Sequence, residues 1–130
     1  MAAVSAKPRR VGKSGFLIQD GLTVYVDPVD VPAGLPKADI VFLTGPGEGR
    51  YSPKDVEAVS TASTVVAGSK DCVARFRLNQ LPVREGEVKN VLGLSVRIQA
   101  AGEPGCLSYV LHLPGGALLA APGREPEAAA

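Results

Sequence analysis

A short apolar run, followed at once by a glycine-rich loop and a well-marked helix start, constrains the fold of this chain most strongly. The run, residues 39–43, is continuous rather than alternating, which is typical of a strand covered on both faces. The loop reads Thr44-Gly45-Pro46-Gly47-Glu48-Gly49-Arg50-Tyr51. After it, Ser52 can cap a helix, Pro53 suits its first position, and Asp55 favours the positive end of its dipole. These signals predict a strand, a loop and a helix that ends near Ser60.

Other elements are expected on both sides of this unit. Strands at 14–19 and 22–26 flank Asp20-Gly21, a dipeptide that favours a two-residue type I′ turn because such turns need positive φ. A buried strand at 64–67 and a short helix at 70–77 follow. Five further strands are separated by glycine-containing turns, at 81–83, 88–91, 93–100, 107–113 and 116–120. A hairpin, then βαβα, then antiparallel strands predict mixed α/β layers around a sheet.

Length and composition indicate one domain. The chain has 130 residues, of which 45% are hydrophobic and 21% charged, so it can bury a core. We place the domain at 11–122, between a flexible basic N-terminus at 1–10 and a frayed tail at 123–130. The net charge of +1 gives no general argument for binding nucleic acid or a membrane.

Cysteine usage and the chain's first residues indicate the compartment. The two cysteines, Cys72 and Cys106, are expected to be reduced thiols, because the N-terminus has no apolar region of a secretion signal. No run approaches the ~18 apolar residues of a membrane-spanning helix. We therefore expect a cytoplasmic protein without a membrane partner.

Five stretches match the motifs of one known family in order and spacing. Residues 15–18 and then 24–28 look like its opening hairpin and Asp-Pro turn. Residues 35–41 match its Pro-x-Ala-Asp-ϕ-Val strand start, and 51–56 match Tyr-Ser-Pro-x-Asp-Val. Residues 118–123 stand where the family has an Ala-Gly-Asp-Thr turn. Together these stretches resemble the metallo-β-lactamase-fold hydrolases of the ascorbate-lactonase-like branch.

The resemblance implies that the glycine-rich loop is a former metal-binding loop. The family carries Thr-His-x-His-x-Asp-His-Tyr there, and these ligands hold metal ions that lower the pKa of a bound water. In this chain the corresponding positions are Gly45, Gly47, Gly49 and Arg50. Glycine supplies no side-chain ligand, and an arginine repels a cation.

Two later positions complete the comparison with that family. Pro122 stands in place of the bridging aspartate, and Gly105-Cys106 stands where relatives have another histidine. The chain also ends where the family continues into a second half, which normally carries the last histidine. The resemblance thus implies a truncated metallo-β-lactamase-like α/β sandwich with a mixed sheet and a few short helices, without metal, cofactor or catalytic residues.

We therefore expect a pseudoenzyme that acts as a protein-binding or assembly module. A half sandwich would leave an apolar sheet face exposed, and a partner protein or a second copy would cover it. Nucleic acid is not expected as a partner, since aromatic residues make up only 5% of the chain.

Two other functions stay open. One is a divergent metal-dependent hydrolase, for which Asp27, Glu48, His112 and Cys106 are the available ligands. His112 is the only histidine and shares a strand face with Ser108 and Val110, so it cannot form a metal centre alone. Cys72, beside Val73, is expected to be a small buried apolar residue.

The other alternative is an anion or nucleotide site at the glycine-rich loop. A glycine-rich loop between a strand and a helix can point backbone N–H groups at an anion, with Gly47, Gly49 and Arg50 as the contributing residues. The loop is not a Walker A sequence, because the Lys-Ser/Thr pair is absent.

Overall fold

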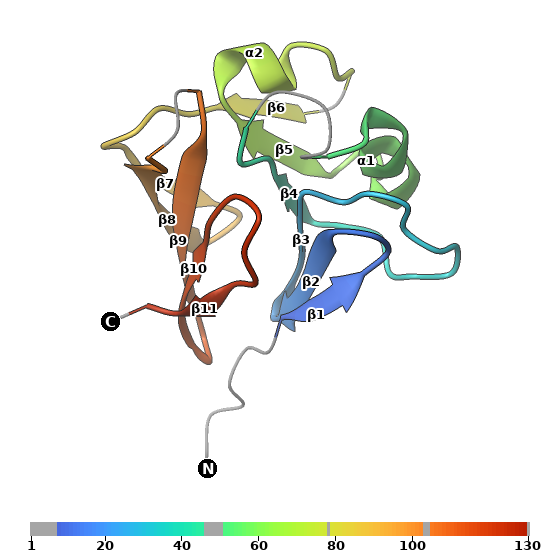
Figure 1. Ribbon diagram of the computed structural model, residues 1–130, viewed down its shortest axis with the longest axis horizontal. Coiled ribbons are helices and arrows are strands. Elements are labelled where there is room, and N and C mark those ends of the chain that lie inside the picture. Colours follow the sequence, from blue (N-terminus) through green and yellow to red (C-terminus); the bar gives the residue numbers. More distant parts are fainter. Residues whose placement is uncertain (1–7, 46–50, 78, 103–104, 130) are drawn as a thin grey trace.

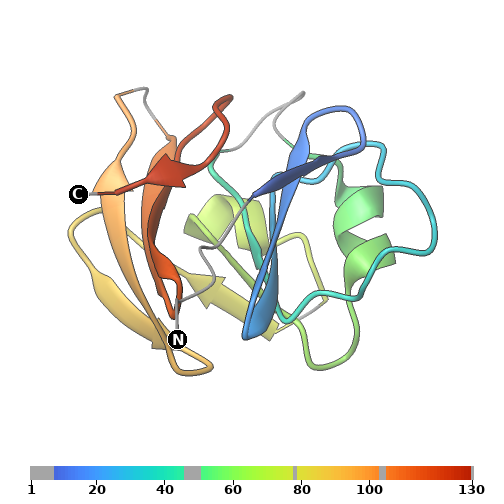
Figure 2. The same ribbon diagram turned by 90° about the horizontal axis from the view of Figure 1, so that it is seen from below.

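The protein consists of two β-sheets packed face to face, with two short helices on the far side of the first sheet (Figures 1 and 2). The computed structural model describes residues 8–45, 51–77, 79–102 and 105–129. The first sheet has the order β1(Arg9–Val11), β2(Gly15–Asp20), β3(Leu22–Val26), β4(Ile40–Phe42), β5(Val65–Gly68), β6(Asn79–Pro82). The second has the order β11(Glu127–Ala128), β10(Gly116–Ala120), β9(Leu107–Leu113), β8(Leu94–Ala100), β7(Val88–Val91). The helices are α1(Pro53–Val59) and α2(Lys70–Val73).

The two sheets differ in strand direction. β1, β2 and β3 pair antiparallel, whereas β3, β4, β5 and β6 pair parallel. All pairs of the second sheet are antiparallel. β4, β5 and β6 are parallel because they are joined by βαβ connections through α1 and α2, which cross the face away from the second sheet. β3 reaches its parallel partner β4 through a connection without a helix. The expected mixed α/β sandwich is therefore present.

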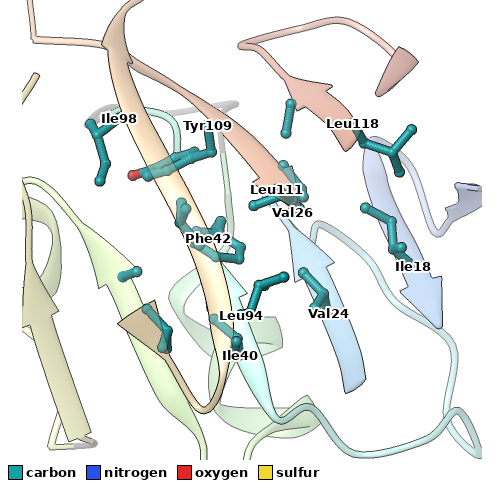
Figure 3. Close-up of a cluster of buried hydrophobic side chains, with 14 of the residues drawn as sticks. Ile18, Val24, Val26, Ile40, Phe42, Leu94, Ile98, Tyr109, Leu111 and Leu118 are labelled. Atoms are coloured by element: carbon teal, nitrogen blue, oxygen red, sulfur yellow. The ribbon is translucent and has the colours of Figure 1, made fainter. Parts of the chain in front are cut away.

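One apolar cluster fills the space between the sheets. Figure 3 shows Phe42 of β4 facing Tyr109 of β9, and their ring centroids are 4.8 Å apart. The other labelled side chains of this cluster come from both sheets: Ile18, Val24, Val26, Ile40, Leu94, Ile98, Leu111 and Leu118. Burial of these side chains holds the two sheets together, because each fully buried aliphatic or aromatic side chain contributes roughly 1.5–3 kcal/mol.

A second apolar cluster lies between the first sheet and the helices. Val41 and Leu43 face this side, where Val56 and Val59 of α1 pack on them, while Ile40 and Phe42 face the other sheet. The strand at 40–42 is therefore covered on both faces, as its continuous apolar run predicts.

Helix α1 begins where its sequence signals place it. The Ser52 hydroxyl accepts a hydrogen bond from the Asp55 N–H at 3.4 Å, and Pro53 is the first helical residue. The Asp55 carboxylate accepts the N–H groups of Asp30 and Val31, both at 2.9 Å. Burial alone would raise the pKa of Asp55, but the hydrogen bonds from Ser52, Val31 and Asp30 bring it below its ordinary value.

Two local expectations differ from the structure. The hairpin between β2 and β3 pairs Asp20 with Leu22 and reverses at Gly21, whose φ is +81°. Asp20 is not among the residues with positive φ, so the predicted type I′ turn is wrong. The Asp20 carboxylate instead accepts the N–H of Gly115 at 2.6 Å. Helix α2 ends at Val73 rather than near residue 77, although Phe76 beyond its end is buried.

Both ends of the chain contribute strands. Arg9 and Arg10, expected in a flexible N-terminus, belong to β1 and pair with β2, while residues 1–7 lie outside the described part. In the segment expected to be frayed, Glu127 and Ala128 form β11 and pair with β10. The hydrogen-bonded structure therefore extends at both ends beyond the domain bounds of 11–122 that the sequence analysis gives.

The outward face of the second sheet carries polar and apolar residues. Ser95, Arg97, Gln99 and His112 point outward, and Val110 and Leu119, which are paired, lie among them. Figure 2 shows this sheet as an outer layer, with α1 on the opposite side of the molecule. The alternation of inward apolar and outward polar residues is typical of a sheet with one solvated face. The face is thus more polar than the apolar surface expected from the sequence. Within the described residues, no helix is long and apolar enough to cross a membrane.

Candidate functional site

The carboxyl ends of the parallel strands bring the candidate site residues together. β3, β4 and β5 run parallel, so their carboxyl ends lie side by side at one end of the first sheet. Asp27, Thr44 and Ser69, which follow these strands, lie at that end. The N–H of Leu107, the first residue of β9, donates to the Thr44 carbonyl at 2.6 Å and brings the second sheet to the same end. We call this region, centred on Asp27, Thr44 and Gly45, the loop end of the sandwich.

Asp27 is buried and forms hydrogen bonds with Thr44. Its carboxylate accepts the Thr44 backbone N–H at 2.9 Å and also the Thr44 hydroxyl. Its own N–H donates to the Phe42 carbonyl at 3.1 Å, and its φ is +46°, a conformation that aspartate tolerates better than most residues. Asp27 is only 6% exposed and Thr44 is fully buried. The carboxylate therefore holds the start of the glycine-rich loop in place.

Cys106 fills the space next to Gly45. A Cβ atom at Gly45 would lie 2.6 Å from the Cys106 Sγ, which is far inside van der Waals contact. Cys106 is 8% exposed and precedes β9. A side chain at position 45 therefore requires the Cys106 thiol to move, because the other nearby atoms of Cys106 lie at ordinary contact distances of 3.5 and 3.6 Å. The first histidine position of the resembled loop is thus occupied from across the sandwich.

Two tyrosines surround this centre. The Tyr109 hydroxyl donates to the Leu43 carbonyl at 2.7 Å, and burial, followed by the charges of Asp27 and Cys72, raises the pKa of Tyr109 well above its ordinary value. Burial also raises the pKa of Tyr51, which forms a hydrogen bond with Cys72. Both phenols are therefore neutral at physiological pH and act as hydrogen-bonding groups.

A small hollow of about 70 Å³ opens beside Asp27 at the loop end. It is bordered by Arg10 and Ser14 on one side and by Ala121, Gly123 and Arg124 on the other. Residues 121–123 follow β10 and include Pro122, which stands in place of the family's bridging aspartate. This segment therefore lies at the loop end. Arg10 lies 5.2 Å from the centre of the Phe16 ring, and Arg124 pairs with Glu127 at 3.0 Å.

His112 lies at the other end of the sandwich. It borders a hollow of about 430 Å³ together with the β2–β3, β7–β8 and β9–β10 turns, where Gly21, Leu92 and Pro114 are found. We call this region the hairpin end. Of the four candidate ligands of a divergent hydrolase, only Asp27 and Cys106 come to the loop end, and Glu48 lies outside the described residues.

The described residues of the loop end do not fit a catalytic metal. A zinc site needs three or four ligands, whereas the described part of the chain contains no group of three His, Cys, Asp or Glu side chains that could hold an ion. The Asp27 carboxylate is engaged by Thr44, and Cys106 packs against Gly45. Gly47, Gly49 and Arg50, named as former ligand or anion positions, lie outside the described residues. Cys72 is buried in α2, as expected.

Sequence reasoning did not identify Thr44 and Tyr109 as partners in this site. The loop sequence includes Thr44, but nothing local indicates that its hydroxyl meets the Asp27 carboxylate, 17 positions earlier. Tyr109 bonds to Leu43, 66 positions away, through the packing of the two sheets. An alternating strand pattern places Tyr109 inward, and that is the only signal its sequence gives.

The comparison with solved structures supports the fold. The chain is similar to a crystal structure from Parabacteroides distasonis ATCC 8503 named "Putative metal-dependent hydrolase", with 18% identity and a TM-score of 0.76. The match covers 88% of this chain but 59% of that one, so this chain spans about three fifths of its length. Neither protein-family models nor curated proteins give a match. The similarity is one of fold.

Proposed function

We propose that this chain is a non-catalytic domain with a metallo-β-lactamase-like fold that acts as a protein-binding or assembly module. The observation that carries the proposal is the packing of Cys106 against Gly45. In a hydrolase of the resembled branch, that loop position holds a metal ligand. Here the Cys106 thiol occupies the space that a side chain at this position would enter, and the neighbouring carboxylate of Asp27 is bound to Thr44.

Polar groups at the loop end are arranged for stability. Every buried side-chain nitrogen and oxygen of the described residues has a hydrogen-bond partner. Catalytic sites commonly retain incompletely bonded polar groups that act on a substrate. The satisfied carboxylate, hydroxyl and phenols of this end support a structural role instead.

Metal content tests the proposal. The full chain, purified without chelator, is measured by plasma mass spectrometry, with a metal-dependent hydrolase of similar fold prepared in parallel as the control. We expect far less than one zinc, manganese or iron per chain, while the control retains its metal. Near-stoichiometric metal in this chain contradicts the proposal and supports the divergent hydrolase.

A second candidate function is anion binding at the loop end, favoured by the guanidinium groups of Arg10 and Arg124 at the small hollow. The Asp27 carboxylate at the same hollow opposes it. Titration with inorganic phosphate, followed by amide chemical shifts, tests this candidate. Saturable shifts that Arg124→Ala or Arg50→Ala abolishes, and that Arg97→Ala on the outward sheet face leaves unchanged, support it. No saturable shift eliminates it.

A further inference from the structure

β7 is the least protected of the four edge strands in the described structure. β1 carries the adjacent charges of Arg9 and Arg10, β6 ends in Pro82, and β11 has only 2 residues. Charge, proline and short length are the features that keep an edge from pairing with another chain. β7, with the sequence Val-Lys-Asn-Val, has 4 residues, contains no proline and carries a single charge, at Lys89. Figure 1 shows it at the free border of the second sheet.

The exposed apolar side chains lie on the same hairpin. Among the described residues, the large hydrophobic side chains that are exposed are Val88, at 64%, and Leu92, at 56%. Val88 is in β7, and Leu92 begins the turn to β8 with φ of +52°. Exposed apolar residues that gather beside an open strand edge indicate an interaction surface.

The backbone of β7 offers hydrogen-bonding groups to a further strand. The Glu87 carbonyl accepts the Ile98 N–H at 2.9 Å, so residue 87 faces β8. Because the direction of backbone groups alternates along a strand, residues 89 and 91 also face β8, and Val88 and Asn90 point their N–H and C=O groups to the open edge.

Charge distinguishes two ways in which a second copy can pair there. In a symmetric antiparallel pair, the two-fold axis must pass beside a residue rather than between two residues, so that side chains directly opposite each other lie on the same face of the sheet. The amides of Val88 and Asn90 must also face the partner strand. A centre at Lys89 would place two ammonium groups directly opposite each other. A centre at Val88 places the two valines together and sets Lys89 of each copy against Glu87 of the other. Within one chain these two side chains already lie 3.7 Å apart.

We propose that β7 is a self-association strand, on which a second copy of this chain adds its own β7 antiparallel, with Val88 opposite Val88 of the second copy. The pairing continues the second sheet across the two-fold axis and covers the exposed valines. It rests on the proposed function, because it names the partner of the assembly module. A strand from a different protein is the alternative occupant of this edge.

The test measures mass and backbone protection on the full chain. Sedimentation velocity from micromolar to near-millimolar concentration is expected to show a shift from 13.4 kDa towards twice that mass. Hydrogen exchange at the Val88 amide should slow over the same range. We expect Val88→Lys and Lys89→Glu each to weaken dimerisation by about tenfold or more, since both set like charges against each other.

Matched variants distinguish an effect on strand pairing at the β7 edge from a general effect of changing a charge. Lys89→Arg keeps the charge and should dimerise as the unchanged chain does, and Gln99→Lys adds a charge to the same sheet face on the inner strand β8 and should also leave the dimer intact. A single 13.4 kDa species at all concentrations overturns the proposal, even if another protein's strand binds the edge. A dimer that Val88→Lys does not weaken overturns it too. Metal content is a separate readout, so a failure here is distinct from failure of the proposed function.

Discussion

At the loop end of the sandwich, polar side chains are buried and satisfied, whereas near the β7–β8 hairpin apolar side chains are exposed beside an open strand edge. Asp27, Thr44 and Tyr109 each find a partner inside the loop end. Val88 and Leu92 are largely in solvent. The contrast teaches that the described polar groups of the loop end are used to hold the sheets and loops together, whereas the exposed apolar groups near β7 are available for contact.

The largest effect is expected from Asp27→Ala. This change leaves the Thr44 N–H and hydroxyl buried without their acceptor, which should cost about 3 kcal/mol of unfolding free energy. Denaturant unfolding measures it. The matched control is Asp39→Ala, where a half-buried carboxylate accepts the Thr23 N–H alone and about 1 kcal/mol is expected. Equal losses for the two variants would remove the distinction between the loop end and the rest of the sheet.

A smaller, pH-dependent effect is expected from Asp55→Asn. The folded-state pKa of Asp55 lies below its ordinary value, so the unfolded chain binds the proton more readily and the carboxylate stabilises the fold above that value. At pH 7 the variant should lose about 1 kcal/mol, and its difference from the unchanged chain should shrink as pH falls below about 4. Unfolding midpoints from pH 7 to pH 3 measure this difference. A difference that stays constant across that range contradicts the assigned role.

The smallest effect, of opposite sign, is expected at the hairpin end. Leu92 has φ of +52° and Gly93 has φ of +88°, so this turn suits Asn-Gly better than Leu-Gly. Leu92→Asn should stabilise the monomer by about 0.5 kcal/mol, because it relieves backbone strain and removes an exposed apolar group. Thermal unfolding at low protein concentration measures it. A marked destabilisation would mean that Leu92 contributes to packing, against its exposure.

The sequence predicts the fold more fully than the site. The continuous apolar run at 39–43 and the capping signals at Ser52 and Pro53 are local, and the strand and helix appear as predicted. The prediction of a type I′ turn at Asp20-Gly21 is wrong because strand pairing continues through Asp20 and Leu22, so that the chain reverses at Gly21. The same limit applies at the loop end. A motif shows that ligands are absent, but only the tertiary structure shows that Cys106 fills the space beside Gly45.

A double-mutant cycle of Gly45 and Cys106, followed by denaturant unfolding, tests the central claim that this site is filled. We predict that Gly45→Ala alone costs about 1–3 kcal/mol, because its methyl group meets the Cys106 sulfur. Cys106→Ala removes that sulfur, so the double variant should be more stable than the sum of the single losses by about 1 kcal/mol or more. Strictly additive losses would mean that the thiol does not occupy the space beside Gly45, and would contradict the account.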